Sequence, residues 1–185
     1  MSKDSLISHL LELRSRLLRV ILFIFVTIVI GAPFASDLFS FFASPLLASF
    51  PENSSMIATQ VTSPFMAPFK LLIFSAFLIS MPYFFYELWS FIAPGLFENE
   101  KSFVGPLIFS TVILFTMGVA FAYFVVCPII FKFFIGIAPE SVIVMTDITQ
   151  YIGFVMKLVF AFGIAFEMPI ATFLLVSSGV VKKST

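Results

Sequence analysis

Long apolar runs, broken by short polar stretches, set the pattern of this chain. Four runs stand out, at about residues 17–36, 69–89, 103–129 and 150–175. A helix needs about 20 consecutive apolar residues to cross the hydrocarbon core of a bilayer, and each run reaches or approaches that length. The pattern therefore predicts an all-α integral membrane protein in which residues 1–185 form a single transmembrane domain of four spans.

The segments between the runs predict loops on alternating sides of the membrane. Residues 37–68 carry four prolines and a polar stretch at residues 52–55, so we expect a partly ordered cap with room for one short helix. Residues 130–149 predict a second loop on the same, outer side. Residues 90–102, which include Pro94 followed by Gly95, predict a compact turn on the inner side.

Prolines within the apolar runs or at their ends predict bent helices. A proline has no backbone N–H, and its ring clashes with the preceding helical turn. The five prolines in such positions are Pro33, Pro82, Pro106, Pro128 and Pro169. We therefore expect a kinked helix bundle with a concave face, which would suit a protein that cradles another helix.

The distribution of lysine and arginine predicts the orientation. With the N-terminus inside, the outer side holds only Lys70 and Lys132. The inner segments then hold seven basic residues, namely Lys3, Arg14, Arg16, Arg19, Lys101, Lys182 and Lys183. Because basic residues gather on the cytoplasmic side, both ends of this chain are expected in the cytoplasm.

Composition agrees with a lipid environment and narrows the chemistry. The chain is 61% hydrophobic and 11% charged, whereas a soluble domain is usually about 45–50% apolar and about 25% charged. The formal net charge is zero, and no long basic run points to nucleic acid. Cys127 is the one cysteine, so neither an internal disulfide nor a metal cluster is expected.

The sequence carries none of the common enzyme signatures. It has no HExxH, no GxSxG and no phosphate-binding loop, and its one histidine, His9, lies in the polar N-terminal segment. We therefore predict that the protein is not an enzyme and holds no cofactor or metal.

The N-terminal segment predicts an amphipathic helix with a charged face. Leucines recur at helical spacing, at Leu6, Leu10, Leu13 and Leu17. Glu12 and Arg16 are four residues apart and Arg19 is three further on, so they share a face and predict a surface ion pair. Arg14 lies about 200° round the helix from Glu12 and is not expected to pair with it.

The inner turn places acidic and apolar residues at the membrane surface. Phe91 and Leu96 precede Glu98 and Glu100, with Lys101 beside them. Ordinary solvated charge is one interpretation. The other is an acidic patch that, with Glu12, captures a basic peptide; carboxylates at a partly desolvated interface bind guanidinium in bidentate fashion and so favour arginine over lysine.

Glu167 is the most unusual single residue, because it interrupts the fourth apolar run. A carboxylate at the centre of a membrane helix costs about 2.5–3.5 kcal/mol on insertion scales, so such a residue usually faces a protein partner or a water-lined groove. Lys157 lies ten residues earlier, which places it about 15 Å away along the axis. We therefore predict that the two residues do not pair.

Five segments together resemble TatC, the core subunit of the bacterial twin-arginine protein translocase. They are HLLELRSRL (9–17), MIATQVTSPF (56–65), LWSFIAPGLFENEK (88–101), GVAFAYFVVCP (118–128) and FGIAFEMPIA (162–171). The resemblance implies a glove-shaped bundle of six spans, of which this chain supplies four, without the fifth and sixth. It also implies a multi-pass protein of the bacterial cytoplasmic (inner) membrane.

The resemblance also implies roles for individual residues. Glu12 and Glu100 would receive the two arginines of a signal peptide, beside Phe91 and Leu96 and with the functionally important Arg14. A second set lies elsewhere: Pro45 matches a proline of the first outer loop, and Glu167 matches a glutamate that faces the groove and contacts partner helices.

The implied function is that of a signal-peptide receptor and core of a translocase that exports folded proteins and is driven by the proton gradient. Its implied partners are the single-span TatA and TatB subunits, further TatC copies and twin-arginine precursor proteins. Two alternatives remain open from the residues: a small-molecule or ion transporter that uses Glu167 and Lys157, and a purely structural scaffold. The resemblance gives no role for Lys157.

Overall fold

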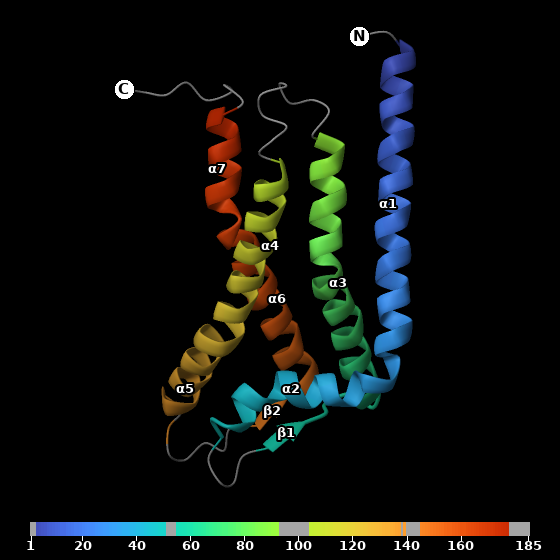
Figure 1. Cartoon of the computed structure of the whole chain (residues 1–185). Coiled ribbons are helices and arrows are strands. Elements are labelled where there is room, and N and C mark those ends of the chain that lie inside the picture. The colour runs from blue at the N-terminus through green and yellow to red at the C-terminus, as the bar shows by residue number, and fades with distance from the viewer. Residues whose placement is uncertain (1–2, 51–54, 93–103, 138, 140–144, 178–185) are drawn as a thin grey trace, which may run out of the picture.

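Helices make up nearly all the regular structure in the computed structural model, which describes residues 3–50, 55–92, 104–137, 139 and 145–177. Two long helices stand side by side at one edge of the molecule, and the remaining long helices form a second group beside them (Figure 1). The edge pair is α1 (Lys3–Gly31) and α3 (Ser63–Ile92); the second group is α4 (Val104–Phe121), α5 (Cys127–Ile137), α6 (Ile148–Phe166) and α7 (Met168–Ser177).

Four helical stretches are long and apolar enough to cross a membrane within the described residues. They run over Ile7–Leu47, Ser63–Ile92, Gly105–Ile137 and Ile148–Phe173. Their order matches the four apolar runs, but α3 begins at Ser63 rather than near residue 69. Pro64 does not delay the helix, because it lies in the first turn, where the backbone N–H has no helical partner, and α3 continues through Pro68.

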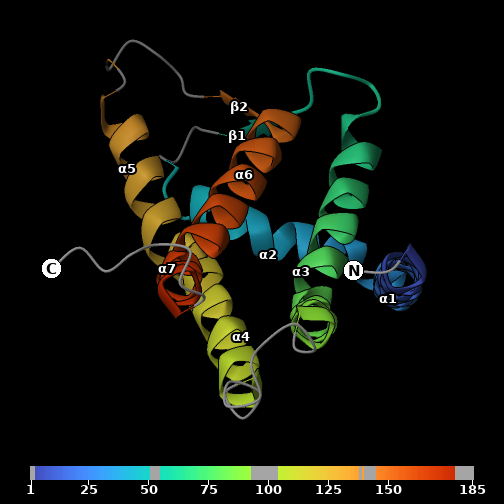
Figure 2. The same cartoon turned by 90° about the horizontal axis from the view of Figure 1, so that it is seen from above.

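The first outer segment, so named for the side of the membrane predicted for it, contains the short helix that the sequence allowed. The chain leaves α1 through a 3₁₀ turn at Ala32–Phe34, which contains Pro33, and then forms α2 (Ala35–Leu47) across one end of the bundle (Figures 1 and 2). The two outer segments also pair with each other. Strand β1 (Ser55–Ile57) lies parallel to β2 (Met145–Asp147), a pairing that no three-residue pattern in the sequence could indicate.

Two of the predicted bends have a clear proline cause. Residues Ala122–Val126 form a π-helical turn between α4 and α5. Pro128 follows and clashes with the carbonyl four residues earlier, at Phe124, so the wider turn upstream relieves the conflict. The second bend separates α6 from α7 at Glu167, two residues before Pro169. In contrast, α3 stays a single helix through Pro82.

The core lies where α2, α3, α5 and α6 meet. Its larger buried members are Phe42, Leu46, Leu71, Phe74, Tyr123, Phe131, Tyr151, Ile152, Val155 and Val159. Helix α1 stands outside it and packs mainly on α3. Val20 is the one buried apolar side chain of α1 among those described, so α1 depends on its contact with α3 for its position.

Candidate functional site

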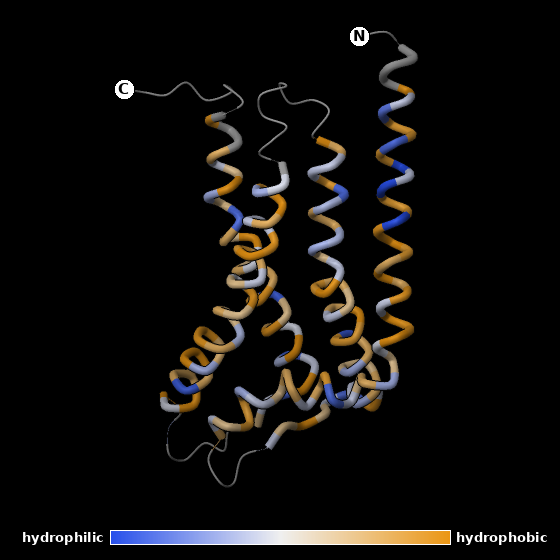
Figure 3. Tube along the Cα trace, in the orientation of Figure 1, coloured by the Kyte–Doolittle hydropathy of each residue, from blue (hydrophilic) through white to orange (hydrophobic). Residues whose placement is uncertain are grey.

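Hydrophilic residues concentrate in the N-terminal half of α1 (Figure 3), and there a charged side chain of α1 pairs with one of α3. An apolar seam brings them together: Leu13, Leu17 and Val20 of α1 line the same small cavity as Phe84 and Leu88 of α3. Side chains three or four residues apart share one helical face. Arg16 of α1 and Glu87 of α3 follow the same spacing and line the same cavity, so they face each other across the seam.

Glu87 of α3 is the buried member of that pair. Only 3% of the residue is exposed. Its Oε2 accepts a hydrogen bond from Nη1 of Arg16 at 2.9 Å, and its Oε1 accepts one from the hydroxyl of Tyr83 at 2.8 Å. Nη1 of Arg19 lies 3.3 Å from Oε1. A buried carboxylate is strongly unfavourable unless it is paired, and here two guanidinium groups and a hydroxyl satisfy it.

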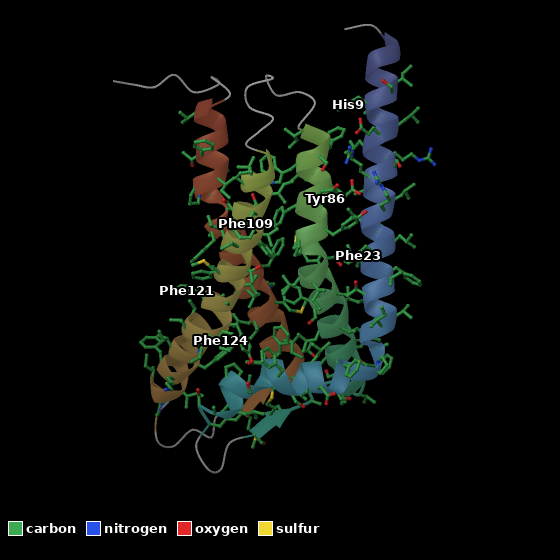
Figure 4. The ribbon with its side chains drawn as sticks, viewed as in Figure 1. His9, Phe23, Tyr86, Phe109, Phe121 and Phe124 are labelled. Atoms are coloured by element: carbon green, nitrogen blue, oxygen red, sulfur yellow. The ribbon has the colours of Figure 1, made fainter. Side chains whose placement is uncertain are left out.

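Glu12 of α1 forms the exposed end of the same group. Its Oε1 accepts hydrogen bonds from Nε of Arg16 at 3.0 Å and from Nη2 at 2.6 Å, so the predicted Glu12–Arg16 ion pair is present. Its side chain is 40% exposed, and its Oε2 lies 3.8 Å from Nδ1 of His9. His9 is labelled on α1 in Figure 4, and its ring stacks on Phe91 with 4.1 Å between the ring centroids.

Opposite charges alternate across the two helices. We call Glu12, Arg16, Glu87 and Arg19 the α1–α3 charge network. Arg16 joins the two carboxylates, and Arg19, which shares a helical face with Glu12, pairs with Glu87 instead. Adjacent charge-assisted hydrogen bonds of this kind fasten α1 to α3 and leave an acceptor oxygen, Oε2 of Glu12, at the surface.

The other residues predicted for the site divide into two groups. Arg14 is exposed and lines a shallow hollow on another face of α1, with Leu11 and Leu18, as the helical geometry predicts. Leu96 and Glu100 lie outside the described residues. The expected proximity of Glu12 and Glu100 therefore stays a prediction.

Glu167 lies at the break between α6 and α7. Pro169 has no N–H to donate to the carbonyl of Ala165, and the N–H of Glu167 turns instead to the carbonyls of Ala165 and Ile164. The Glu167 side chain is half-buried, and its Oε1 has no hydrogen-bond partner among the described residues. The carboxylate therefore offers an acceptor that the described part of the chain does not use.

Lys157 and Glu167 stay apart. Lys157 is exposed on α6, and no ion pair joins it to Glu167 in the part of the chain that the structure describes. This agrees with the separation expected along a helix axis.

Pro45 lies within α2, in the first outer segment. Because Pro45 has no N–H, the carbonyl of Phe41 receives no helical bond from it. That carbonyl instead accepts hydrogen bonds from the hydroxyl of Ser44, at 2.8 Å, and from that of Tyr123. The proline thus leaves the Phe41 carbonyl free to accept the hydrogen bond from Tyr123. This bond ties α2 to the π-helical turn between α4 and α5.

Asp147 joins the two outer segments. Its Oδ1 caps α6 by accepting from the N–H groups of Thr149 and Gln150, at 2.9 and 3.0 Å. Its Oδ2 accepts from the hydroxyl and the N–H of Thr59, at 2.5 and 3.0 Å. The Thr59 hydroxyl, followed by the backbone donors, lowers the pKa of Asp147 from 3.8 to about 2. The carboxylate therefore stays ionised and holds the β1 segment on α6.

Sequence reasoning missed Glu87 and Asp147 as organising residues. A usable signal for Glu87 was the excess of positive charge on one face of α1, where Arg16 and Arg19 share the one carboxylate of Glu12. For Asp147 the signal was its place before an apolar helix, where aspartate is a favoured cap.

Comparison with known proteins gives one consistent answer. The family described as Sec-independent protein translocase protein (TatC) matches residues 8–185. The TatC protein of Azotobacter chroococcum mcd 1 is 51% identical over 176 residues, which are 95% of this chain and 69% of that protein. The TatC protein of Haemophilus influenzae is 47% identical over 175 residues, 95% of this chain and 68% of that protein.

A solved structure agrees with these relatives. The crystal structure of a twin-arginine translocase receptor, TatC, is 38% identical and superposes with a TM-score of 0.83 over 94% of this chain and 77% of that one. This match confirms the predicted all-α, kinked TatC-like bundle. The chain therefore belongs to the TatC family of Sec-independent protein translocase proteins, which are membrane protein-transport components and not enzymes.

Proposed function

We propose that the N-terminal end of the α1–α3 pair binds twin-arginine signal peptides, and that the chain is the receptor core of a translocase that exports folded proteins across the bacterial cytoplasmic membrane. The observation that carries the proposal is the exposed carboxylate of Glu12. One of its oxygens is bound by Arg16, and the other, Oε2, has no arginine partner among the described residues. One relative of known structure is a twin-arginine translocase receptor, which supports the same function.

The chemistry follows from the geometry of guanidinium. A guest arginine can donate two parallel hydrogen bonds to carboxylate oxygens, whereas lysine offers a point charge without that fork. Glu12 supplies one acceptor group, and Glu100 is proposed as the second. Phe91, whose ring stacks on His9, and Leu96 are proposed to provide an apolar contact for the same peptide. Arg14 is included in the site on the resemblance alone.

The proposed contacts with other subunits involve the α6–α7 region of the chain. The unused Oε1 of Glu167 is proposed to contact the single helices of TatA and TatB, and further TatC copies complete the assembly. The proton gradient is proposed as the energy source on the family resemblance, and the absence of a phosphate-binding loop from this sequence is consistent with it. We propose that both ends of this chain lie in the cytoplasm, which the lysine and arginine count favours. Secondary transport through Glu167 and Lys157 finds no support in their separate positions.

A crosslinking experiment tests the receptor function. A photoreactive phenylalanine derivative replaces Phe91, and a matched control places it at Leu22, which is exposed on α1 but lies away from Phe91. Precursor proteins with an Arg-Arg or a Lys-Lys pair are added to membranes that contain either variant. We expect adducts at residue 91 with the Arg-Arg precursor alone. Equal adduct yields with both precursors, or equal yields at residues 91 and 22, would refute the proposal.

The energy source and orientation have separate tests. An ionophore that collapses the proton gradient should stop export without changing the adduct yield at residue 91. Export that continues at the same rate would contradict the proposed energy source. A cysteine at Ser49, in the first outer segment, should react with an impermeant thiol reagent from outside the cell, and labelling only after lysis would contradict the proposed orientation.

A further inference from the structure

Glu87 has no role in the receptor function as described so far, yet it is the centre of the α1–α3 charge network. It is the most buried charged residue among those described, at 3% exposure. Its oxygens meet Arg16, Arg19 and Tyr83 within 3.3 Å. Apolar packing along the seam could attach α1 to α3 without any charged residue. The deep burial of this carboxylate therefore needs another explanation.

The explanation lies in how Arg16 divides its donors. Its Nη1 donates to Oε2 of Glu87, while its Nε and Nη2 both donate to Oε1 of Glu12. The guanidinium plane is rigid, so a donor fixed on Glu87 fixes the other two as well. Arg16 consequently occupies one oxygen of Glu12 and leaves the other, Oε2, free of arginine contacts among the described residues.

Without Glu87 this division would not last. A guanidinium beside a single carboxylate favours the bidentate arrangement, with two parallel hydrogen bonds to two oxygens. Arg16 would then turn to cover both oxygens of Glu12, and it would compete directly with an incoming arginine. The charge on Glu87 is what makes the present arrangement preferable.

We infer that Glu87 is a positioning residue of the receptor site, which holds Arg16 on a single oxygen of Glu12 and so keeps the second oxygen open to the guanidinium of a guest peptide. This inference rests on the proposed function. It assigns specificity for arginine over lysine partly to a buried residue that never touches the peptide. Glu12 remains the residue that makes the contact.

The test compares two peptides and three variants of the chain in lipid nanodiscs. The peptides are one twin-arginine signal peptide and its twin-lysine form, and their affinities are measured by fluorescence anisotropy. Glu87→Gln keeps one acceptor oxygen and the side-chain volume, whereas Glu87→Met removes both acceptors. Thr111→Val is the matched control, because it removes an equally buried hydrogen bond, from Trp89 of α3 to α4, away from the network.

We expect the ratio of arginine to lysine affinity to fall by about tenfold in Glu87→Met, the middle of the range for coupled neighbours. Glu87→Gln should lie between Glu87→Met and the unaltered chain, and Thr111→Val should leave the ratio unchanged. A purely structural role would lower both affinities equally and leave their ratio intact, in Glu87→Met as in the control. That outcome would overturn the inference.

A double-mutant cycle separates this inference from the proposed function. If Glu87 acts through Glu12, the effect of Glu87→Gln should disappear in a Glu12→Gln background; additive effects would overturn the positioning role while the receptor function stands. An unaltered chain that binds both peptides equally would overturn the receptor function itself. Because Glu87→Gln keeps size and an acceptor, it also decides the matter if Glu87→Met fails to fold.

Discussion

A close approach between two helices predicts which small residue the bundle cannot lose. At Gly118 of α4, an added Cβ would lie 2.6 Å from the backbone oxygen of Phe162 and 3.0 Å from Cβ of Phe166, both on α6. At Gly153 of α6, an added Cβ would meet nothing within 4 Å. The same substitution, glycine to alanine, is therefore expected to have opposite effects at the two positions.

The magnitude follows from two opposing terms. Alanine stabilises the interior of a helix by about 0.5–1 kcal/mol relative to glycine, and that is the whole effect expected of Gly153→Ala. Gly118→Ala gains the same term, but α4 and α6 must move apart, which costs about 1–3 kcal/mol. The expected difference between the two variants is this packing cost, because both share the same change in helix propensity.

Reversible unfolding in mixed micelles measures the difference, with the single tryptophan, Trp89, as the fluorescent reporter. Gly118→Ala should unfold at a lower denaturant fraction than the unaltered chain, and Gly153→Ala at the same or a higher one. If Gly118→Ala proved as stable as Gly153→Ala, the close crossing of α4 and α6 would be refuted.

Three further changes test other contacts. Asp147 has its pKa lowered from 3.8 to about 2, so its contribution to stability is complete above about pH 4 and is lost as the pH falls toward 2. The unfolding midpoint of the unaltered chain should therefore fall over this pH range more than that of Asp147→Asn. An equal fall in both would contradict the capping role. Tyr123→Phe removes the hydrogen bond to the Phe41 carbonyl and should destabilise the chain by about 1 kcal/mol in the same micelle assay; no loss would show that this bond does not hold α2. Lys157→Met should favour membrane insertion of α6 by up to about 2.5–3.5 kcal/mol, measured by glycosylation mapping, and unchanged insertion would mean that the ammonium already reaches water.

The fold was largely predictable because lipid imposes a simple rule. A chain with no water to satisfy its backbone must form long helices, so the apolar runs indicate their number and order directly. The boundary at Ser63 was less predictable, since prolines mark both loops and first helical turns. The pairing of β1 with β2 joins Ser55 to Met145, and three residues carry too little pattern to reveal a partner so distant in sequence.

The site was predictable only where it is local. Glu12 and Arg16 are four residues apart on one helix, and their contact follows from helical spacing. Arg16 and Glu87 are 71 residues apart, and only the packing of α1 on α3 brings them together. Glu87 lies near the end of the second apolar run, and the sequence cannot distinguish a buried carboxylate there from an interfacial one, because the donors around it come from another helix.

Two carboxylates inside apolar helices therefore require opposite explanations. Glu87 is more buried than Glu167, yet both of its oxygens are satisfied by donors from α1 and α3, so its energetic needs are met within the described chain. Glu167 is less buried but keeps a buried oxygen without a partner among the described residues. An unsatisfied buried acceptor costs about 1–3 kcal/mol, and a charged one more, a cost that a donor from another helix would remove. Glu87 thus belongs to the internal framework of the α1–α3 pair, and the unmet hydrogen-bonding capacity of Glu167 is the physical reason for proposing it as a contact for a partner helix.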